Sequence, residues 1–247
     1  MSQVPQIEIH TVKKVNLKGG TLIDGFPSGG LTNSIASMCF MGSLRNELIS
    51  VLDSPAFPPL SIIHNGIANF PARIYANEAL KVAFLISELN LNESMYYTVS
   101  KTILQWAMQN ECELVISSGT ISAEESKPSK EYNMPKVYGV ASTTKARDKL
   151  KNAEMILDLH SGSVSGIPAL LLNEGVRRNF EVIVLLGKMP KESSEFRPAA
   201  AVSEAIMRLV PGLSCDIRSL LTRAKTIEQD LKTVRAGQSN SAKNLYR

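Results

Sequence analysis

A short apolar strand, a glycine-rich turn and a helix follow one another in residues 20–41, and this order constrains the fold more than any other stretch. Residues 21–23 are apolar and predict a strand. Residues 24–30 contain Gly and Pro, which permit the backbone angles of a tight turn. This order predicts the first half of a βαβ unit, with backbone N–H groups and a helix N-terminus placed where an anion can bind. The apolar residues that recur at helical spacing after the turn are Leu31, Ile35, Met38, Phe40 and Met41.

The glycine-rich turn lacks the partners of the known phosphate-binding motifs. A P-loop places Lys after its last glycine, whereas Leu31 follows Gly30 here, and the dinucleotide pattern G-x-G-x-x-G is absent. We therefore favour a structural role for these glycines, with ligand binding as the alternative. A second small-residue loop, residues 161–166, precedes another expected helix, so an anionic ligand between the two loops stays open. The candidate ligand residues are Asp24, Gly25, Ser28, Gly29 and Gly30 in the first loop and Ser161, Gly162 and Ser163 in the second.

Strands and helices alternate along most of the chain, which predicts an α/β fold with a mainly parallel sheet and helices on both faces. Residues 82–86 form a continuous apolar run, typical of a strand buried on both faces of a parallel sheet. Residues 61–67 and 72–76 are interpreted as the two strands of a hairpin. Thr143 and its neighbours are expected to cap a short helix that ends near Lys151. The polar stretch 120–135 is expected to be an exposed excursion and receives no role.

Composition excludes several classes of protein. The net charge of +4 is too small to indicate a nucleic-acid-binding protein. The start of the chain has no apolar signal segment, and no run of 18 apolar residues exists, so we expect neither secretion nor a membrane span. Cys39, Cys112 and Cys215 are odd in number and far apart, which suits a reducing compartment and provides no metal framework. We therefore expect a cytoplasmic protein without a metal or other cofactor.

No recognisable catalytic constellation occurs in the sequence. The three histidines, His10, His64 and His160, stand apart, and no H-E-x-x-H or G-x-S-x-G pattern is present. Asp24 is interpreted as an acceptor of hydrogen bonds from the turn that follows it. Asp158, close to His160, is interpreted in the same way as a hydrogen-bonded group. The sequence therefore favours a non-enzymatic protein.

The last three residues form a motif of their own. Leu245, Tyr246 and Arg247 place an apolar residue, a tyrosine and a free carboxylate at the end of a small, polar stretch. Such an end suits insertion into a pocket between subunits, because tyrosine supplies a ring and a hydroxyl donor and the carboxylate pairs with a lysine or with backbone donors.

The body of the chain resembles the proteasome assembly chaperone family, in particular its archaeal members. The resemblance covers residues 22–221 and rests on the order of several moderately specific segments. The loop at residues 27–30 departs from the Pro-Gly and small-residue order of many relatives, and the 120–135 excursion has no counterpart. The segments that carry the resemblance are residues 22–31, 137–142, 162–172, 182–186 and 197–201.

This resemblance implies a three-layer α/β/α fold similar to nucleoside phosphorylases, without their chemistry. It also implies a homo-oligomer that binds proteasome α subunits or the core particle. In that family a C-terminal hydrophobic-Tyr-X (HbYX) end docks, and Leu245, Tyr246 and Arg247 match it position by position. We expect one α/β domain, residues 1–235, and a docking tail, residues 236–247. Two hypotheses follow: a non-catalytic proteasome chaperone or activator, or a phosphorylase- or ligase-like enzyme that uses the two glycine loops.

Overall fold

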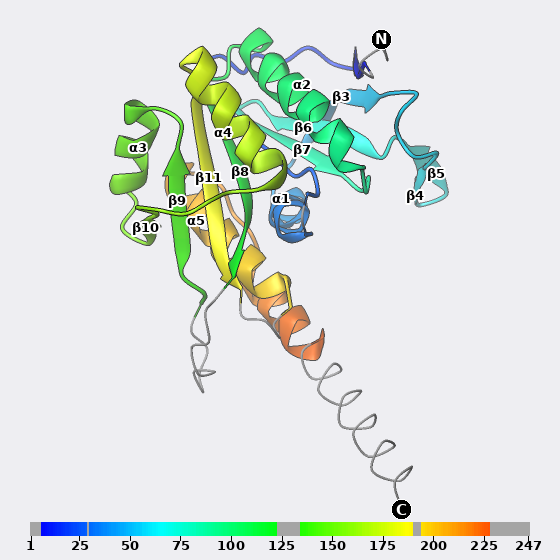
Figure 1. The fold of residues 1–247 in the computed structure, drawn as a ribbon. Helices are drawn as coiled ribbons and strands as arrows, with labels where there is room; N and C mark the ends of the chain where they lie inside the picture. Colours follow the sequence, from blue (N-terminus) through cyan, green and yellow to red (C-terminus); the bar gives the residue numbers. More distant parts are fainter. Residues whose placement is uncertain (1–5, 29, 123–133, 190–193, 228–247) are drawn as a thin grey trace, which may run out of the picture.

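One large β-sheet with helices on both sides forms the body of the protein (Figure 1). The computed structural model describes residues 6–28, 30–122, 134–189 and 194–227. The described strands are β1 (Glu8–Thr11), β2 (Thr21–Ile23), β3 (Glu47–Asp53), β4 (Ile62–His64), β5 (Ile67–Asn69), β6 (Ala72–Asn77), β7 (Val82–Ser87), β8 (Leu114–Ser122), β9 (Val137–Ala141), β10 (Ile156–Asp158) and β11 (Glu181–Met189).

Side-chain caps start two of the described helices, α3 (Thr144–Lys151) and η1 (Glu93–Met95). Thr143 accepts a hydrogen bond from the backbone N–H of Ala146, which confirms the predicted cap. Asn92 accepts one from Ser94 in the same way. Residues 217–227 are also helical. The other helices are α1 (Thr32–Ser43), α2 (Tyr96–Gln109), α4 (Gly166–Arg178) and α5 (Phe196–Leu209).

The main sheet has nine strands in the order β1-β3-β6-β7-β2-β8-β11-β9-β10. The four central strands, β7, β2, β8 and β11, run parallel to one another. Antiparallel pairs lie outside them: β6 pairs with β7 on one side, and β9 pairs with β11 on the other. The predicted α/β class and the parallel core of the sheet are confirmed. The specific likeness to nucleoside phosphorylases stays a prediction.

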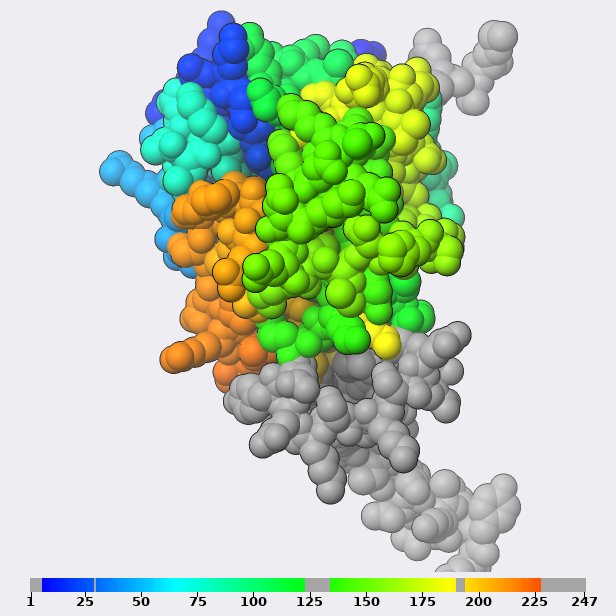
Figure 2. Space-filling model, turned by 90° about the vertical axis from the view of Figure 1, so that its left-hand side faces the viewer, coloured from blue at the N-terminus to red at the C-terminus, as the bar shows by residue number. Residues whose placement is uncertain are grey.

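Alternating side chains of the central strands form two separate cores. On β11, Val182 and Val184 belong to the core beneath α2 and α4, whereas Ile183 and Leu185 belong to the core beneath α1, α3 and α5. Both faces of the sheet are therefore covered, as the apolar run in β7 predicted. In the space-filling view, α3 and its neighbouring strands (green) lie beside the segment that follows α5 (orange), so together they form one continuous surface (Figure 2).

The buried face of α1 consists mainly of small and polar residues. Thr32, Asn33, Ser37 and Phe40 are buried, whereas the apolar Leu31 and Met38 are exposed. The cause is the close approach of this helix to the loop after β2. A Cβ atom on Gly25 would lie 2.7 Å from the Cβ of Ser37 and 2.4 Å from the carbonyl oxygen of Leu85. Only small side chains fit along this contact. Of the predicted apolar residues of α1, Leu31 and Met38 are therefore exposed, whereas Phe40 is buried and Ile35 and Met41 pack against the core.

The hairpin in residues 61–76 differs from the prediction. β4 and β5 form their own two-stranded sheet, joined at Asn65 and Gly66, whose φ angles are 50° and 76°. An Asn-Gly pair readily adopts these positive angles and makes a tight two-residue turn. Residues 61–67 are therefore not one strand, and β6 pairs with β3 and β7 instead.

Two cysteines that are remote in sequence form a disulfide bond. Cys39 on α1 is bonded to Cys215, and their Cα atoms are 5.3 Å apart. No pairing of these cysteines was predicted from the sequence. Their separation of 176 residues gave no indication of proximity, because it is the packing of α1 beside α5 that brings them together. The third cysteine, Cys112, is free and buried.

Candidate functional site

The two glycine loops meet in space at the carboxyl ends of central strands. The Ser28 hydroxyl oxygen accepts a hydrogen bond of 3.1 Å from the backbone N–H of Ile167, at the start of α4. A Cβ atom on Gly166 would lie only 2.8 Å from that oxygen, so glycine permits the contact. Ser161, Gly162 and Ser163 are exposed on the outer part of the second loop. Gly29 lies outside the described residues.

Asp24 is the centre of a buried hydrogen-bond network. Its carboxylate accepts bonds from the backbone N–H of Phe26 at 2.9 Å, from the Asn33 amide at 2.9 Å and from the Ser117 hydroxyl at 2.7 Å. The side-chain oxygen of Asn33 in turn accepts from the backbone N–H and the hydroxyl of Ser118. The network therefore joins the loop after β2 to both α1 and β8. The bond from Phe26 is the turn contact that the sequence predicted.

Burial determines the electrostatics of Asp24. The side chain is fully buried, and loss of solvation raises its pKa above the ordinary 3.8, while the three donors act in the opposite direction. Because the side chain is fully buried, a ligand could reach this carboxylate only if the surrounding segments moved apart. The arrangement is that of a structural carboxylate that holds a turn.

Glu195 occupies the N-terminus of α1. Its carboxylate accepts hydrogen bonds from the backbone N–H of Leu31, from that of Thr32 at 2.7 Å and from the Thr32 hydroxyl at 3.1 Å. An anionic ligand at a helix N-terminus would use these same donors. Gly30 allows the approach, since a Cβ atom there would lie 2.8 Å from the Glu195 carboxylate. The protein therefore fills its own predicted anion site with a side chain from the start of α5.

The space left between these groups is very small. The crevice has a volume of about 10 Å³, which is room for about one water molecule. A substrate of the size of a nucleoside or nucleotide cannot enter this arrangement. The lining residues are Ser28, Gly30, Thr32, Asn33, Ser118, Gly119, Thr120 and Glu195.

We expect the Glu195→Ala variant to be less stable by about 1 to 2 kcal/mol, because the first turn of α1 loses its charged cap. The measurement is the free energy of unfolding from urea titrations. Glu154→Ala, which removes an exposed carboxylate, serves as the control and is expected to change this free energy by less than about 0.5 kcal/mol. Equal values for the two variants would show that the Glu195 contacts do not stabilise the fold.

Other groups in the described ranges provide no alternative catalytic centre. Burial raises the pKa of the Cys112 thiol to about 12, so this cysteine is a poor nucleophile. Across the ranges given above, no three His, Cys, Asp or Glu side chains are grouped so that they could hold a metal ion. Within the same ranges, no helix has the length and apolar character needed to cross a membrane. Asp158 forms an ion pair with Arg147 at 3.2 Å rather than with His160.

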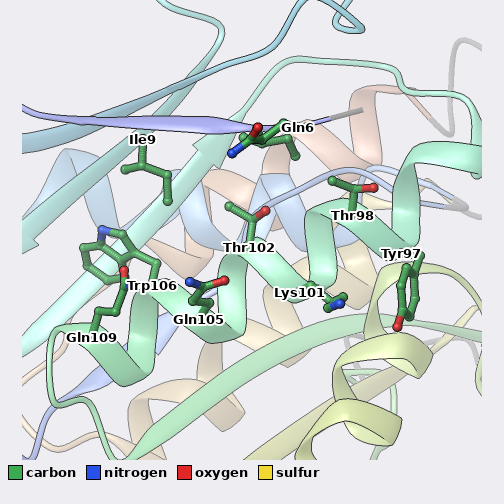
Figure 3. Close-up of a pocket in the computed structure, with 10 residues that line it drawn as sticks. Gln6, Ile9, Tyr97, Thr98, Lys101, Thr102, Gln105, Trp106 and Gln109 are labelled. Atoms are coloured by element: carbon green, nitrogen blue, oxygen red, sulfur yellow. The ribbon is translucent and has the colours of Figure 1, made fainter. Parts of the chain in front are cut away.

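Two features could not be identified from the sequence. Glu195 is far from α1 in the chain, and only the spatial neighbourhood reveals its role. A groove of about 550 Å³ lies along α2 (Figure 3). The predicted docking residues, Leu245, Tyr246 and Arg247, lie outside the described residues. The described chain leads toward them through the helix at residues 217–227.

The chain matches a protein family along most of its length. The sequence profile of the PAC2 family matches residues 22–235. Pyrococcus furiosus PbaA, an archaeal homolog of proteasome-assembly chaperone, is similar in structure, with a TM-score of 0.77 and 25% identity over 95% of this chain and 100% of PbaA. Pyrococcus furiosus PbaB, an archaeal proteasome activator, has a TM-score of 0.72 and 20% identity over 93% of this chain and 99% of PbaB. An uncharacterized protein of Methanocaldococcus jannaschii is 26% identical over 89% of this chain and 87% of its own length.

The protein is a mixed α/β protein whose central sheet is covered by helices on both faces and whose loop crevice is filled by its own side chains. The chain belongs to the PAC2 family. The predicted resemblance to archaeal proteasome assembly chaperones is therefore confirmed.

Proposed function

We propose that the chain is a non-catalytic proteasome-binding protein that acts as an assembly chaperone or an activator. The observation that carries this proposal is the match to PbaA and PbaB over nearly the whole chain. PbaA is an archaeal homolog of proteasome-assembly chaperone, and PbaB is an archaeal proteasome activator. The closed crevice between the glycine loops supports a role in binding rather than in catalysis, because it leaves no room for a substrate.

The proposed contact with the proteasome is the C-terminal motif. Tyr246 would place its ring in an apolar pocket between α subunits, and the carboxylate of Arg247 would pair with a lysine or backbone donors there. Leu245 would add apolar contact. The proposed organisation is one α/β domain, residues 1–235, with a docking tail at residues 236–247. A homo-oligomer would present several such tails at once and bind a ring of subunits by avidity. The cytoplasmic location expected from the sequence belongs to this proposal.

The test is binding to rings of archaeal proteasome α subunits, followed by native mass spectrometry. We expect the full-length chain to bind and a chain that ends at Asn244 to lose at least about thirtyfold in affinity, the effect of removing a strong anchor. Lys243→Ala changes a neighbouring residue and leaves the motif intact, so it serves as the matched control and should bind like the unmodified chain. Unchanged binding by the shortened chain would overturn the tail mechanism.

The alternative is an enzyme that binds an anionic ligand between the two glycine loops. The contact between Ser28 and Ile167 favours it, because it brings the two loops together. The Glu195 carboxylate opposes it, since that side chain already uses the donors of α1. Millimolar inorganic phosphate, a nucleoside or ATP would raise the melting temperature if this alternative held. We expect no shift.

A further inference from the structure

The β4–β5 hairpin presents large apolar side chains to solvent. Ile63 and Ile67 are 65% and 68% exposed, and Leu60 and Phe70 beside them are 45% and 43% exposed. Residues 54–72 contain no Asp, Glu, Lys or Arg. Figure 1 shows the hairpin at the margin of the molecule, outside the layers of sheet and helices. We call residues 60–70 the arm. An exposed apolar and uncharged surface of this kind marks an interaction site.

Both faces of the arm carry apolar residues. Ile63 pairs with Ala68 across the hairpin, whereas the neighbouring pair, His64 and Ile67, points to the opposite face. A two-stranded hairpin alone is marginally stable in water, and burial of one face would still leave an exposed isoleucine. The arm therefore suits a groove that covers it on two sides better than a flat surface.

The same chain has a groove with matching chemistry. The groove of about 550 Å³ lies between the segment around β1 and the outer side of α2 (Figure 3). Its charged lining residue is Lys101, whose ammonium lies 5.2 Å from the centre of the Tyr97 ring. No residue of the arm lines it. The remaining lining residues are apolar or neutral: Gln6, Ile7, Ile9, Thr98, Thr102, Gln105, Trp106 and Gln109.

We propose that the arm of one copy of this chain inserts into the α2 groove of a second copy. The apolar parts of the groove, such as Ile9 and Trp106, fit the isoleucines of the arm. Its amides and hydroxyls fit the two open edges of the hairpin. Among the described strands, none pairs with the outer N–H and C=O groups of these edges. Because the arm has no charge and the groove one cation, the contact requires little desolvation of charged groups.

This contact allows two geometries of assembly. Arm and groove are different surfaces of one chain. The contact is therefore either head-to-tail, and closes into a ring when the rotation permits, or is made twice in a dimer whose two copies exchange arms. The inference rests on the homo-oligomer proposed above and specifies which surfaces form it. It does not depend on the C-terminal tail, so self-association measured without a proteasome tests it separately from the proposed function.

The first test compares the masses of variants by native mass spectrometry. In Ile63→Ser with Ile67→Ser, both changed residues are exposed, so the fold should be retained and the self-association constant should weaken at least about tenfold. Gln105→Arg with Gln109→Arg, which places two charges in the groove at exposed positions, should have the same effect. Val176→Ser on α4 changes an equally exposed apolar residue, 65% exposed, and should associate like the unmodified chain.

Mixing the two defective variants distinguishes arm-to-groove contact from other pairings. The arm variant keeps an intact groove and the groove variant an intact arm, so an equimolar mixture should form a dimer that contains one copy of each. A cysteine pair, Ile63→Cys in one copy and Gln105→Cys in another, should yield a disulfide-linked dimer under mild oxidation by a small-molecule disulfide.

Several outcomes would overturn the proposal. A monomeric unmodified chain, an arm variant that assembles normally, or a mixture without heterodimer would each contradict it. A third occupant is the chain's own N-terminus. In that case the intact chain stays monomeric and does not bind an added peptide of arm sequence, whereas a chain without residues 1–5 binds the peptide. A rise in melting temperature of the monomer with a small apolar amine would indicate a ligand site instead.

Discussion

Replacing Asp24 with alanine is expected to lower the free energy of unfolding by about 3 to 5 kcal/mol. The Phe26 N–H, the Asn33 amide and the Ser117 hydroxyl all donate to this fully buried carboxylate. Removal of the carboxylate leaves these donors without their acceptor in a place that water cannot reach. Each buried donor that loses its acceptor destabilises the fold by about 1 to 3 kcal/mol. Urea unfolding monitored by circular dichroism gives the measurement. A loss of this size is a large part of the stability of an ordinary domain.

The Asp24→Asn variant separates hydrogen bonding from charge. Both oxygens of Asp24 accept bonds, so either orientation of the asparagine amide points an N–H group at a donor, and the variant should be less stable than the unmodified protein. The unmodified protein also carries a pH dependence. The pKa of Asp24 is raised in the folded state, so its protonated form contributes to the free energy of unfolding. This contribution is fully present below pH 3.8 and is lost as the pH rises through the folded-state pKa. The asparagine variant should lack this decline.

Asp53→Ala is the matched control, because Asp53 is exposed and accepts one hydrogen bond, from the backbone N–H of Ser54. Its expected cost is below about 1 kcal/mol. If Asp24→Ala were no more destabilising than Asp53→Ala, the buried network would not hold the first loop. If the unmodified protein and Asp24→Asn had parallel stability curves between about pH 4 and about pH 8, the pKa of Asp24 would not be raised.

The regular elements could be predicted because local patterns define them. The apolar run of β7 and the cap at Thr143 each indicate an element without reference to distant parts of the chain. The hairpin turn at Asn65 and Gly66 was also readable in principle, since this pair is a strong signal for a two-residue turn. The prediction instead placed one strand over residues 61–67, because apolar residues lie on both sides of this pair.

The arrangement of the candidate site could not be predicted, because it depends on contacts between distant segments. The pairing of Cys39 with Cys215 and the bond from Thr32 to Glu195 join residues more than 160 positions apart. The sequence correctly predicted that Asp24 accepts a hydrogen bond from the residues that follow it. It gave no indication that a carboxylate from the start of α5 fills the N-terminus of α1.

The filled crevice differs from the usual ligand site of an α/β sheet. In open α/β sheets the carboxyl ends of the strands usually form the ligand site. Here the hydrogen-bond donors at the carboxyl ends of the strands are satisfied by side chains of the protein itself, namely Glu195, Ser28 and Asp24. These bonds fix α1, α4 and β8 relative to one another. Surfaces away from the crevice are then the available places for recognition. The arm lies outside it.

Breaking the disulfide is the second change with a large expected effect. Reduction, or replacement of Cys39 and Cys215 by alanine, should lower the free energy of unfolding by about 3 to 5 kcal/mol. The bond joins residues 176 positions apart, so it restricts a long loop of the unfolded chain. In the folded state it fastens the segment before the helix at residues 217–227 to α1. That helix otherwise contacts the body through the buried Leu220 and Ala224.

A comparison of single and double variants tests this account. Cys39→Ala and Cys215→Ala should each lose nearly as much stability as the double variant, because either change removes the whole bond. A reducing agent should destabilise the unmodified protein and leave the double variant unchanged, which controls for effects of the reagent. If the helix at residues 217–227 depends on the bond, its amide hydrogens should exchange faster after reduction while those of β7 remain protected. If three thiols can be alkylated in the denatured, unreduced protein, the bond is absent. If the free energy of unfolding is the same with and without reductant, the bond does not stabilise the fold.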